Sequence, residues 1–119
     1  STEPFYIYSF PGSWETTPID TDEIFANLVY EEIIHINIGY SLKEDLNSNL
    51  FFIQQYDDKE RIFSEIFRID SRAGKHEIQK YIKLLPNTTK LRFYFRMENY
   101  SNSINEITLN QLQINKIDK

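Results

Sequence analysis

Residues 91–98 alternate strictly between apolar and polar side chains, and this alternation constrains the fold more than any other stretch. The apolar positions are Leu91, Phe93, Phe95 and Met97, and the polar positions between them are Arg92, Tyr94, Arg96 and Glu98. Successive side chains of a β-strand point to opposite faces, so a period of two predicts a strand with one buried face. The preceding polar turn contains Pro86, which cannot continue a hydrogen-bonded ladder. Residues 91–98 are therefore predicted to be a half-buried strand.

Several other short stretches have β-type patterning and are separated by turn residues. The expected strands are residues 5–10, 34–40, 50–56, 63–69, 77–84, 107–109 and 112–114. The last two are out of phase by one residue, so a β-bulge is expected near Asn110 and Gln111. Residues 13–22 are expected to form a long loop, and residues 23–30 fit either a short amphipathic helix or an irregular strand. About eight short strands with almost no helical periodicity predict an all-β fold, a two-sheet antiparallel β-sandwich.

Length and composition restrict the classes of protein to which the chain can belong. With 119 residues and 40% hydrophobic content, residues 1–119 are expected to form a single β-sandwich domain, either a processed chain or a fragment of a larger protein. The net charge of −5 argues against nucleic acid as a partner. No apolar run approaches the ~20 residues of a membrane span, so no direct membrane insertion is expected. These properties favour a folded domain whose partner is neither nucleic acid nor a membrane.

The sequence contains few residues in patterns typical of a metal or cofactor site. Cysteine is absent, which removes disulfides and Cys-type zinc sites. Two acidic clusters occur, at residues 20–23 and at Asp57 and Asp58. Carboxylates at this spacing either hold a structural calcium ion or form solvated loops, and they lack the spacing of an EF-hand. We therefore expect no cofactor, with structural calcium as the one alternative and the identity of any metal site unknown.

The order of features from Phe67 onward points to a known fold. A short strand is followed by a Gly-containing turn at residues 73–75, a second strand and a Leu-Pro-x-Thr turn at residues 85–88. A Leu-Arg-Phe-x-Phe strand at residues 91–95 and an Ile-x-Leu-x-x-Leu-x-Ile strand at residues 107–114 complete the order. This half of the chain resembles galactose-binding-like jelly-roll domains, the fold of many carbohydrate-binding modules. The resemblance implies glycan binding by aromatic side chains on a concave face or at loop tips.

Four residues are the candidates for carbohydrate binding. Arg92, Tyr94 and Arg96 share the polar face of the strand at residues 91–98, where a tyrosine ring can stack on a sugar while guanidinium groups donate to its oxygens. The same three residues also fit a solvated sheet face with cross-strand ion pairs. Trp14 is the only tryptophan and lies in a polar segment, where it is either an exposed sugar platform or a buried plug under a loop.

Catalytic signals are scarce. No nucleophile-elbow, phosphate-loop or paired-histidine metal motif occurs, so no catalytic residue is assigned. His35 and His76 are the only histidines, and both are interpreted as structural or surface residues. A small hydrolase would require a pocket in which one of them meets a carboxylate. An enzyme is therefore disfavoured.

The sequence supports two hypotheses of function. The first is a non-catalytic carbohydrate-binding accessory domain of a bacterial surface or secreted protein, extracellular, with a glycan or cell-wall polysaccharide as its partner. The alternative is a structural or protein-interaction module, such as a spacer or oligomerisation domain that contacts other domains of a cell-envelope protein, because one fold supports many functions.

Overall fold

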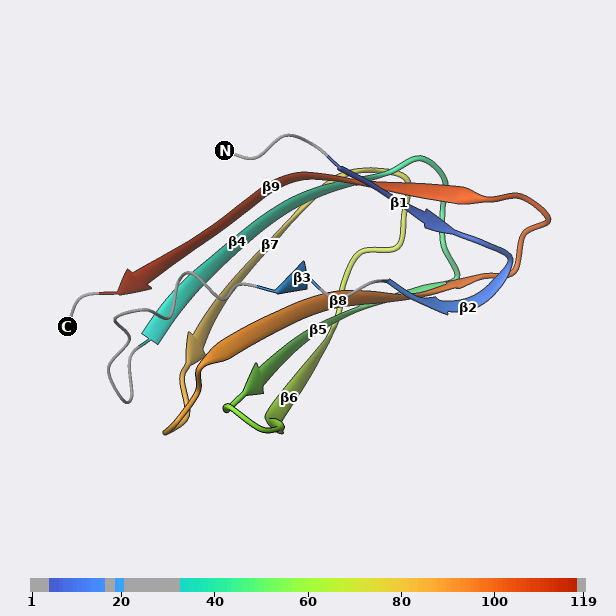
Figure 1. The fold of residues 1–119 in the computed structure, drawn as a ribbon. Coiled ribbons are helices and arrows are strands. Elements are labelled where there is room, and N and C mark those ends of the chain that lie inside the picture. Colours follow the sequence, from blue (N-terminus) through green and yellow to red (C-terminus); the bar gives the residue numbers. More distant parts are fainter. Residues whose placement is uncertain (1–4, 17–18, 21–32, 118–119) are drawn as a thin grey trace.

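The computed structural model describes residues 5–16, 19–20 and 33–117, which form two antiparallel β-sheets facing each other (Figure 1). The strands are β1 (Phe5–Ser9), β2 (Gly12–Glu15), β3 (Ile19–Asp20), β4 (Ile33–Leu42), β5 (Ser48–Tyr56), β6 (Arg61–Arg68), β7 (Gly74–Lys83), β8 (Lys90–Asn99) and β9 (Asn105–Ile117). Sheet A has the order β1-β9-β4-β7. Sheet B has the order β2-β8-β5-β6, and β3 also pairs with β8. The prediction of an all-β two-sheet sandwich is confirmed.

β8 is the central strand of sheet B and has the predicted alternation. It pairs with β5 on one side and with β2 and β3 on the other. Its four apolar side chains are at most 1% exposed, because they face sheet A across the core. The polar residues between them point outward, and Arg96 is exposed. The local period of two therefore decides which side of the strand faces the core.

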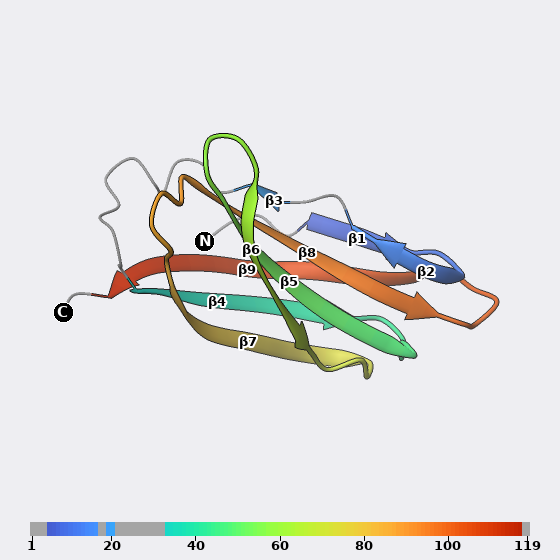
Figure 2. The same cartoon turned by 90° about the horizontal axis from the view of Figure 1, so that it is seen from below.

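The core lies between the two sheets and is rich in aromatic rings and isoleucine. From sheet A, β4 contributes the buried side chains of residues 34, 36, 38 and 40. From sheet B, Phe51 packs against Phe95 with ring centroids 5.3 Å apart and against Phe93 at 5.9 Å. Figure 2 shows the strands of sheet B crossing those of sheet A obliquely. Both inner faces are thus apolar, as a sandwich requires.

Two details of the sequence prediction are tested by the strand pairing. The bulge is confirmed: residues 105–117 form one strand, and its pairing with β4 shifts register between Gly39 and Tyr40, opposite Asn110. The loop predicted for residues 13–22 is wrong in part, because this segment contains most of β2 and all of β3, both paired with β8. The side chains of residues 13–15 are exposed, so no apolar alternation marks β2. Residues 23–30 lie outside the described residues.

The shape of the sandwich gives sheet B a concave outer side. In Figure 1, β8 and β9 arch in the same sense, and β5 and β6 lie on the inner side of the arch. The outer face of sheet B therefore lies on the concave side of this curvature. Within the described part of the chain, no helix is long and apolar enough to cross a membrane.

Candidate functional site

Arg92, Tyr94 and Arg96 lie together on the outer face of sheet B, as the alternation predicts. The cross-strand partners of these residues on β5 are Gln54, Phe52 and Leu50 respectively. Paired residues of an antiparallel ladder point to the same face, so the two strands form one continuous surface. Sequence reasoning did not single out the β5 residues, because residues 50–56 are apolar on both faces and gave no signal of which side is outward.

Tyr94 is held in a fixed position on this face. Its ring stacks on Phe52 with centroids 4.3 Å apart and an interplanar angle of 12°. Its hydroxyl accepts a hydrogen bond from Gln54 Nε2 at 3.3 Å, and Gln54 Oε1 accepts one from the Tyr56 hydroxyl at 3.2 Å. Phe52 and Gln54 are only 7% and 4% exposed although they point out of the sandwich. The supporting side chains thus preorganise the Tyr94 ring, which lowers the entropy cost of binding a ligand.

Electrostatics on the same face keep the tyrosine hydroxyl neutral. Burial, followed by the negative charge of Glu15, raises the pKa of Tyr94 above its ordinary value. The Arg92 guanidinium lies 4.9 Å from the centroid of the Tyr56 ring, and the Lys90 ammonium lies 5.6 Å from it. Such cation–π contacts orient the cations over the ring. The face therefore combines an oriented aromatic ring, an amide and guanidinium groups, which can donate to and stack on a hydroxylated ring.

The structure places Trp14 away from this face. Trp14 pairs with Met97, whose side chain faces the core, so the indole lies on the inner side of the sheet edge. It is 45% exposed, packs on Phe10 with centroids 5.4 Å apart, and donates from Nε1 to the Pro11 carbonyl at 3.2 Å. Trp14 is thus neither a fully buried plug nor part of the surface around Tyr94.

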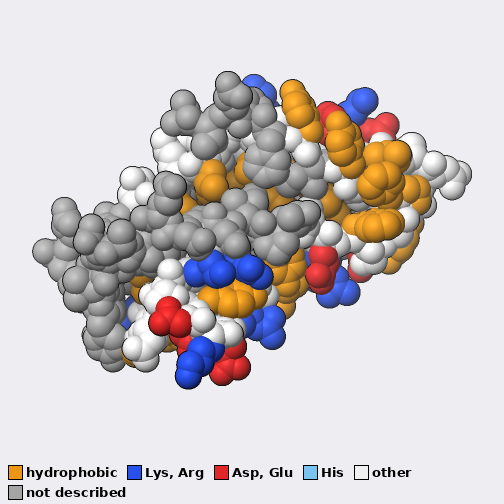
Figure 3. Space-filling view, in the orientation of Figure 1, with side chains coloured by type: hydrophobic (Ala, Val, Ile, Leu, Met, Phe, Trp, Pro, Cys, Tyr) orange, Lys and Arg blue, Asp and Glu red, His pale blue; other side chains and the backbone are white. Residues whose placement is uncertain are grey.

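Trp14 is instead one of four exposed aromatic side chains on β1, β2 and the connection between them. We call this set the β1–β2 corner; its members are Tyr6, Tyr8, Phe10 and Trp14, between 44% and 57% exposed. Figure 3 shows hydrophobic side chains gathered at the right-hand end, where β1 and β2 lie. The four predicted binding residues therefore fall on two separate surfaces, and their role in binding stays a prediction.

The two histidines have different surroundings. The His35 ring lies on the outer face of sheet A, 4.7 Å from the Tyr81 ring centroid. His76 lines a pocket of about 350 Å³ at the open edge between β6 and β7, and its Nδ1 lies 3.6 Å from Asp70 Oδ2. The histidine–carboxylate pair that a hydrolase would require is therefore present. The hydrolase hypothesis depends on whether this pair is available for chemistry.

Both members of the pair are engaged in structural contacts. Asp70 accepts two hydrogen bonds from the Arg72 guanidinium, at 3.1 and 2.9 Å, and His76 Nε2 donates to the Arg72 carbonyl at 2.6 Å. The Tyr40 hydroxyl donates to the Asp70 carbonyl at 2.9 Å. Among the described residues that line the pocket, none is a serine, threonine or cysteine. The group braces the β6–β7 connection, and its described lining offers the histidine no hydroxyl or thiol of serine, threonine or cysteine to activate.

Replacement of Asp70 by asparagine is expected to make the stability of the fold less dependent on pH in the acid range. Hydrogen bonds from Arg72, followed by the His76 charge, hold the pKa of Asp70 well below its ordinary value of 3.8. A carboxylate whose pKa is lower in the folded chain contributes stability above the unfolded pKa, and this contribution is lost as pH falls through the folded pKa. The urea midpoint of the wild type should therefore fall more steeply than that of Asp70→Asn below about pH 4. Asp58→Asn, in the exposed β5–β6 turn, is the matched control and should keep the wild-type slope.

The acidic clusters show no metal site within the described residues. No group of three or more histidine, cysteine, aspartate or glutamate side chains in that part of the chain could hold a metal ion. The Asp57 carboxylate accepts the backbone N–H groups of Lys59 and Glu60, both at 2.8 Å, and so closes the β5–β6 turn. Residues 21–23, which include part of the other cluster, lie outside the described residues. Structural calcium remains a prediction.

Comparison with known proteins places the fold. No family model and no curated protein matches the sequence. Among solved structures, the enzymatically active domain of tailspike protein 4 of bacteriophage CBA120 is similar with a TM-score of 0.72 and 8% identity, over 96% of this chain and 15% of that chain. This chain thus spans a small part of the tailspike chain. The carbohydrate-binding module CBM4 is similar with a TM-score of 0.58 and 6% identity, over 94% of this chain and 82% of that chain.

A second carbohydrate-binding module has the same architecture. The Family 16 Carbohydrate Binding Module-2 is similar with a TM-score of 0.57 and 9% identity, over 90% of this chain and 73% of that chain. At identities of 6–9% these similarities establish the fold and nothing finer. The chain is a β-sandwich of the jelly-roll type found in carbohydrate-binding modules, and the resemblance noted from residue 67 onward is confirmed.

Proposed function

We propose that this chain is a non-catalytic carbohydrate-binding domain that holds a glycan on the outer face of sheet B. The observation that carries the proposal is the Tyr94 ring, stacked on Phe52 and bonded to Gln54, with Arg92 and Arg96 on either side along β8. Sugar recognition in proteins combines an aromatic platform with polar groups that fix orientation. Both kinds of group are present on the concave side of the domain.

The chemistry of this face supports binding rather than catalysis. Glycoside hydrolysis requires two carboxyl groups that flank the scissile bond, one of them with a raised pKa. The face includes the carboxyl groups of Glu15 and Glu98, but Glu98 accepts a hydrogen bond from the Tyr100 hydroxyl at 3.0 Å and Glu15 lies opposite Arg96. The histidine–carboxylate pair lies elsewhere, at the β6–β7 edge. We place the domain on a secreted or surface protein of a bacterium, where polysaccharide ligands and other domains of the parent protein would be its partners.

The proposal is tested by calorimetric titration of the purified chain with a panel of neutral and acidic oligosaccharides. Tyr94→Ala is expected to weaken binding about tenfold or more, because it removes the stacking ring, and Arg96→Ala should weaken binding by removing a donor. Tyr81→Ala is the matched control, since Tyr81 is 69% exposed on the outer face of sheet A and its loss should leave affinity unchanged. Circular dichroism verifies that each variant is folded.

Two outcomes would contradict the proposal. One is a wild-type chain that binds none of the glycans at millimolar concentration, and the other is a folded Tyr94→Ala variant with wild-type affinity. The alternative, a structural or interaction module, is favoured by the exposed rings of the β1–β2 corner. A chain that ignores every glycan but self-associates in sedimentation would support that alternative.

A further inference from the structure

The three glycines of the chain differ in what their backbone requires. Gly12 and Gly74 have φ angles of 116° and 122°, a region that other residues rarely adopt. Gly39 lies in the middle of β4 and has no positive φ. A Cβ atom built there would meet Gln111 Cβ at 3.5 Å and Gln111 Oε1 at 3.8 Å, which is ordinary van der Waals contact. Neither the backbone nor the packing therefore requires a glycine at residue 39.

A side chain at residue 39 would fill a hollow in the outer face of sheet A. The hollow has a volume of about 420 Å³ and lies over Gly39. It is lined by Gly39, Lys75, His76, Glu77, Asn110 and Gln111. The lining comes from three neighbouring strands, because Gly39 pairs with Glu77 of β7 and Gln111 of β9. Glycine in a strand interior often marks a place where a ligand approaches the backbone closely.

The β-bulge contributes to the same hollow. The register of β9 against β4 shifts at Gly39, which leaves Asn110 as the extra residue. Asn110 Nδ2 donates to Ser41 Oγ at 2.8 Å, so the amide is held at the rim of the hollow. Bulges frequently re-aim a side chain toward a functional site. The lack of a side chain on Gly39 and the bulge at Asn110 thus shape the same hollow.

The chemistry of the lining suits a neutral hydroxylated ligand. Lys75 and Glu77 carry opposite charges, and Asn110 and Gln111 each offer an amide donor and an amide acceptor. Sugar hydroxyls both donate and accept hydrogen bonds, so they match such a mixed set. A volume of about 420 Å³ is within the range of small-ligand sites, about 300–1,000 Å³.

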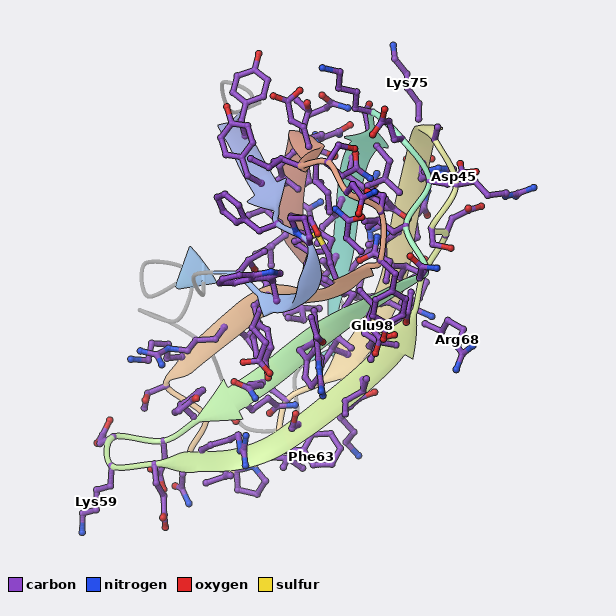
Figure 4. All side chains as sticks on the ribbon, turned by 90° about the vertical axis from the view of Figure 1, so that its right-hand side faces the viewer. Asp45, Lys59, Phe63, Arg68, Lys75 and Glu98 are labelled. Carbon is purple, nitrogen blue, oxygen red and sulfur yellow. The ribbon has the colours of Figure 1, made fainter. Side chains whose placement is uncertain are left out.

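Aromatic rings lie on the same face near the hollow. Ser41, two residues after Gly39 on the same side of β4, pairs with Thr108, which in turn pairs with Tyr6 of the edge strand β1. Tyr6 is 57% exposed and Tyr8 is 53% exposed on this outer face. These tyrosines lie on β1, two strands away from Gly39, and their exposed rings are surfaces on which further units of an extended saccharide can stack. Figure 4 shows Lys75, at the rim of the hollow, on the opposite side of the molecule from Phe63 of sheet B.

We propose that the hollow over Gly39 is a second ligand site, separate from the Tyr94 face, which takes a unit of a neutral saccharide. The inference takes only the class of ligand, a saccharide, from the proposed function. The two sites are otherwise independent, because they lie on the outer faces of different sheets. A domain with two such sites would bind two chains of a polysaccharide, or two parts of one chain, and gain avidity.

The test is a titration of the isotope-labelled chain with the same panel of neutral and acidic oligosaccharides, monitored through the backbone amide resonances. Saccharide should shift two separate groups of resonances, one around Tyr94 and one around Gly39. Gly39→Val fills the hollow with a side chain that suits a strand and should weaken binding at the second group at least tenfold, while the Tyr94 group responds as in the wild type. Glu77→Ala, on an exposed position, is a second variant that should weaken the same group. Gln113→Ala, exposed on the same face outside the lining, is the matched control and should leave both groups unchanged.

The outcomes separate the two proposals. Resonance shifts around Gly39 that persist unchanged in folded Gly39→Val and Glu77→Ala would overturn the second site and leave the Tyr94 proposal intact. Shifts confined to the Gly39 group would overturn the Tyr94 proposal and support the second site. A chain whose resonances respond to none of the oligosaccharides would overturn both.

Discussion

Replacement of Phe95 by alanine should lower the free energy of unfolding by about 3–5 kcal/mol. Phe95 is 1% exposed, and its ring lies 5.3 Å from that of Phe51 and 6.0 Å from that of Tyr40. It therefore joins the inner faces of both sheets. Truncation removes buried apolar surface and leaves a cavity that a close-packed sandwich fills only in part. Equilibrium unfolding in urea, with the midpoint and slope compared with those of the wild type, measures the effect.

The neighbouring residue on the same strand supplies the control. Arg96→Ala changes an exposed side chain on the opposite face and should alter the free energy of unfolding by no more than about 0.5 kcal/mol. The pair of variants tests the register of β8, because a slip of one residue would move Arg96 into the core and Phe95 out of it. Equal losses of stability in the two variants would contradict the assigned faces.

Replacement of Gln55 by leucine is expected to cost about 2–4 kcal/mol, although leucine is more hydrophobic. Gln55 is 1% exposed and points into the domain near the β7–β8 connection. Its Nε2 donates to the Lys83 carbonyl at 3.1 Å, and its Oε1 accepts from the Leu85 N–H and from the Thr88 hydroxyl, both at 2.8 Å. Leucine would remove these partners, and a buried backbone group left unpaired costs about 1–3 kcal/mol. Urea unfolding again measures the loss.

A second glutamine provides the comparison for Gln55. Gln79 is exposed on the outer face of sheet A, so Gln79→Leu should change stability by no more than about 0.5 kcal/mol. A Gln55→Leu variant as stable as the wild type would show that water replaces the amide in the β7–β8 connection. A large loss confined to Gln55→Leu would show that this amide fixes the connection that leads into β8.

The strands with one apolar and one polar face were predictable from the sequence, and the edge strands were not. β4 and β8 have period-two patterns that arise from local geometry, and the phase shift at residues 109–112 located the bulge opposite Gly39. β2 and β3 are short edge strands whose residues follow no apolar pattern, since β2 exposes most of its side chains. Their pairing satisfies the free backbone groups along β8, which is a tertiary effect.

The sequence by itself determined that Arg92, Tyr94 and Arg96 share one side of a strand, because the alternation of side chains is a property of adjacent residues. Only the tertiary structure decided what lies beside them. Phe52 reaches Tyr94 through the pairing of β5 with β8, between residues about 40 positions apart, and the sequence carries no local signal of that contact. Other pairings between distant strands act in the same way: β2 with β8 places Trp14 at the sheet edge, and β4 with β7 and β9 brings together the lining of the hollow over Gly39. Faces of single strands are local, whereas neighbours across a sheet depend on the arrangement of the whole chain.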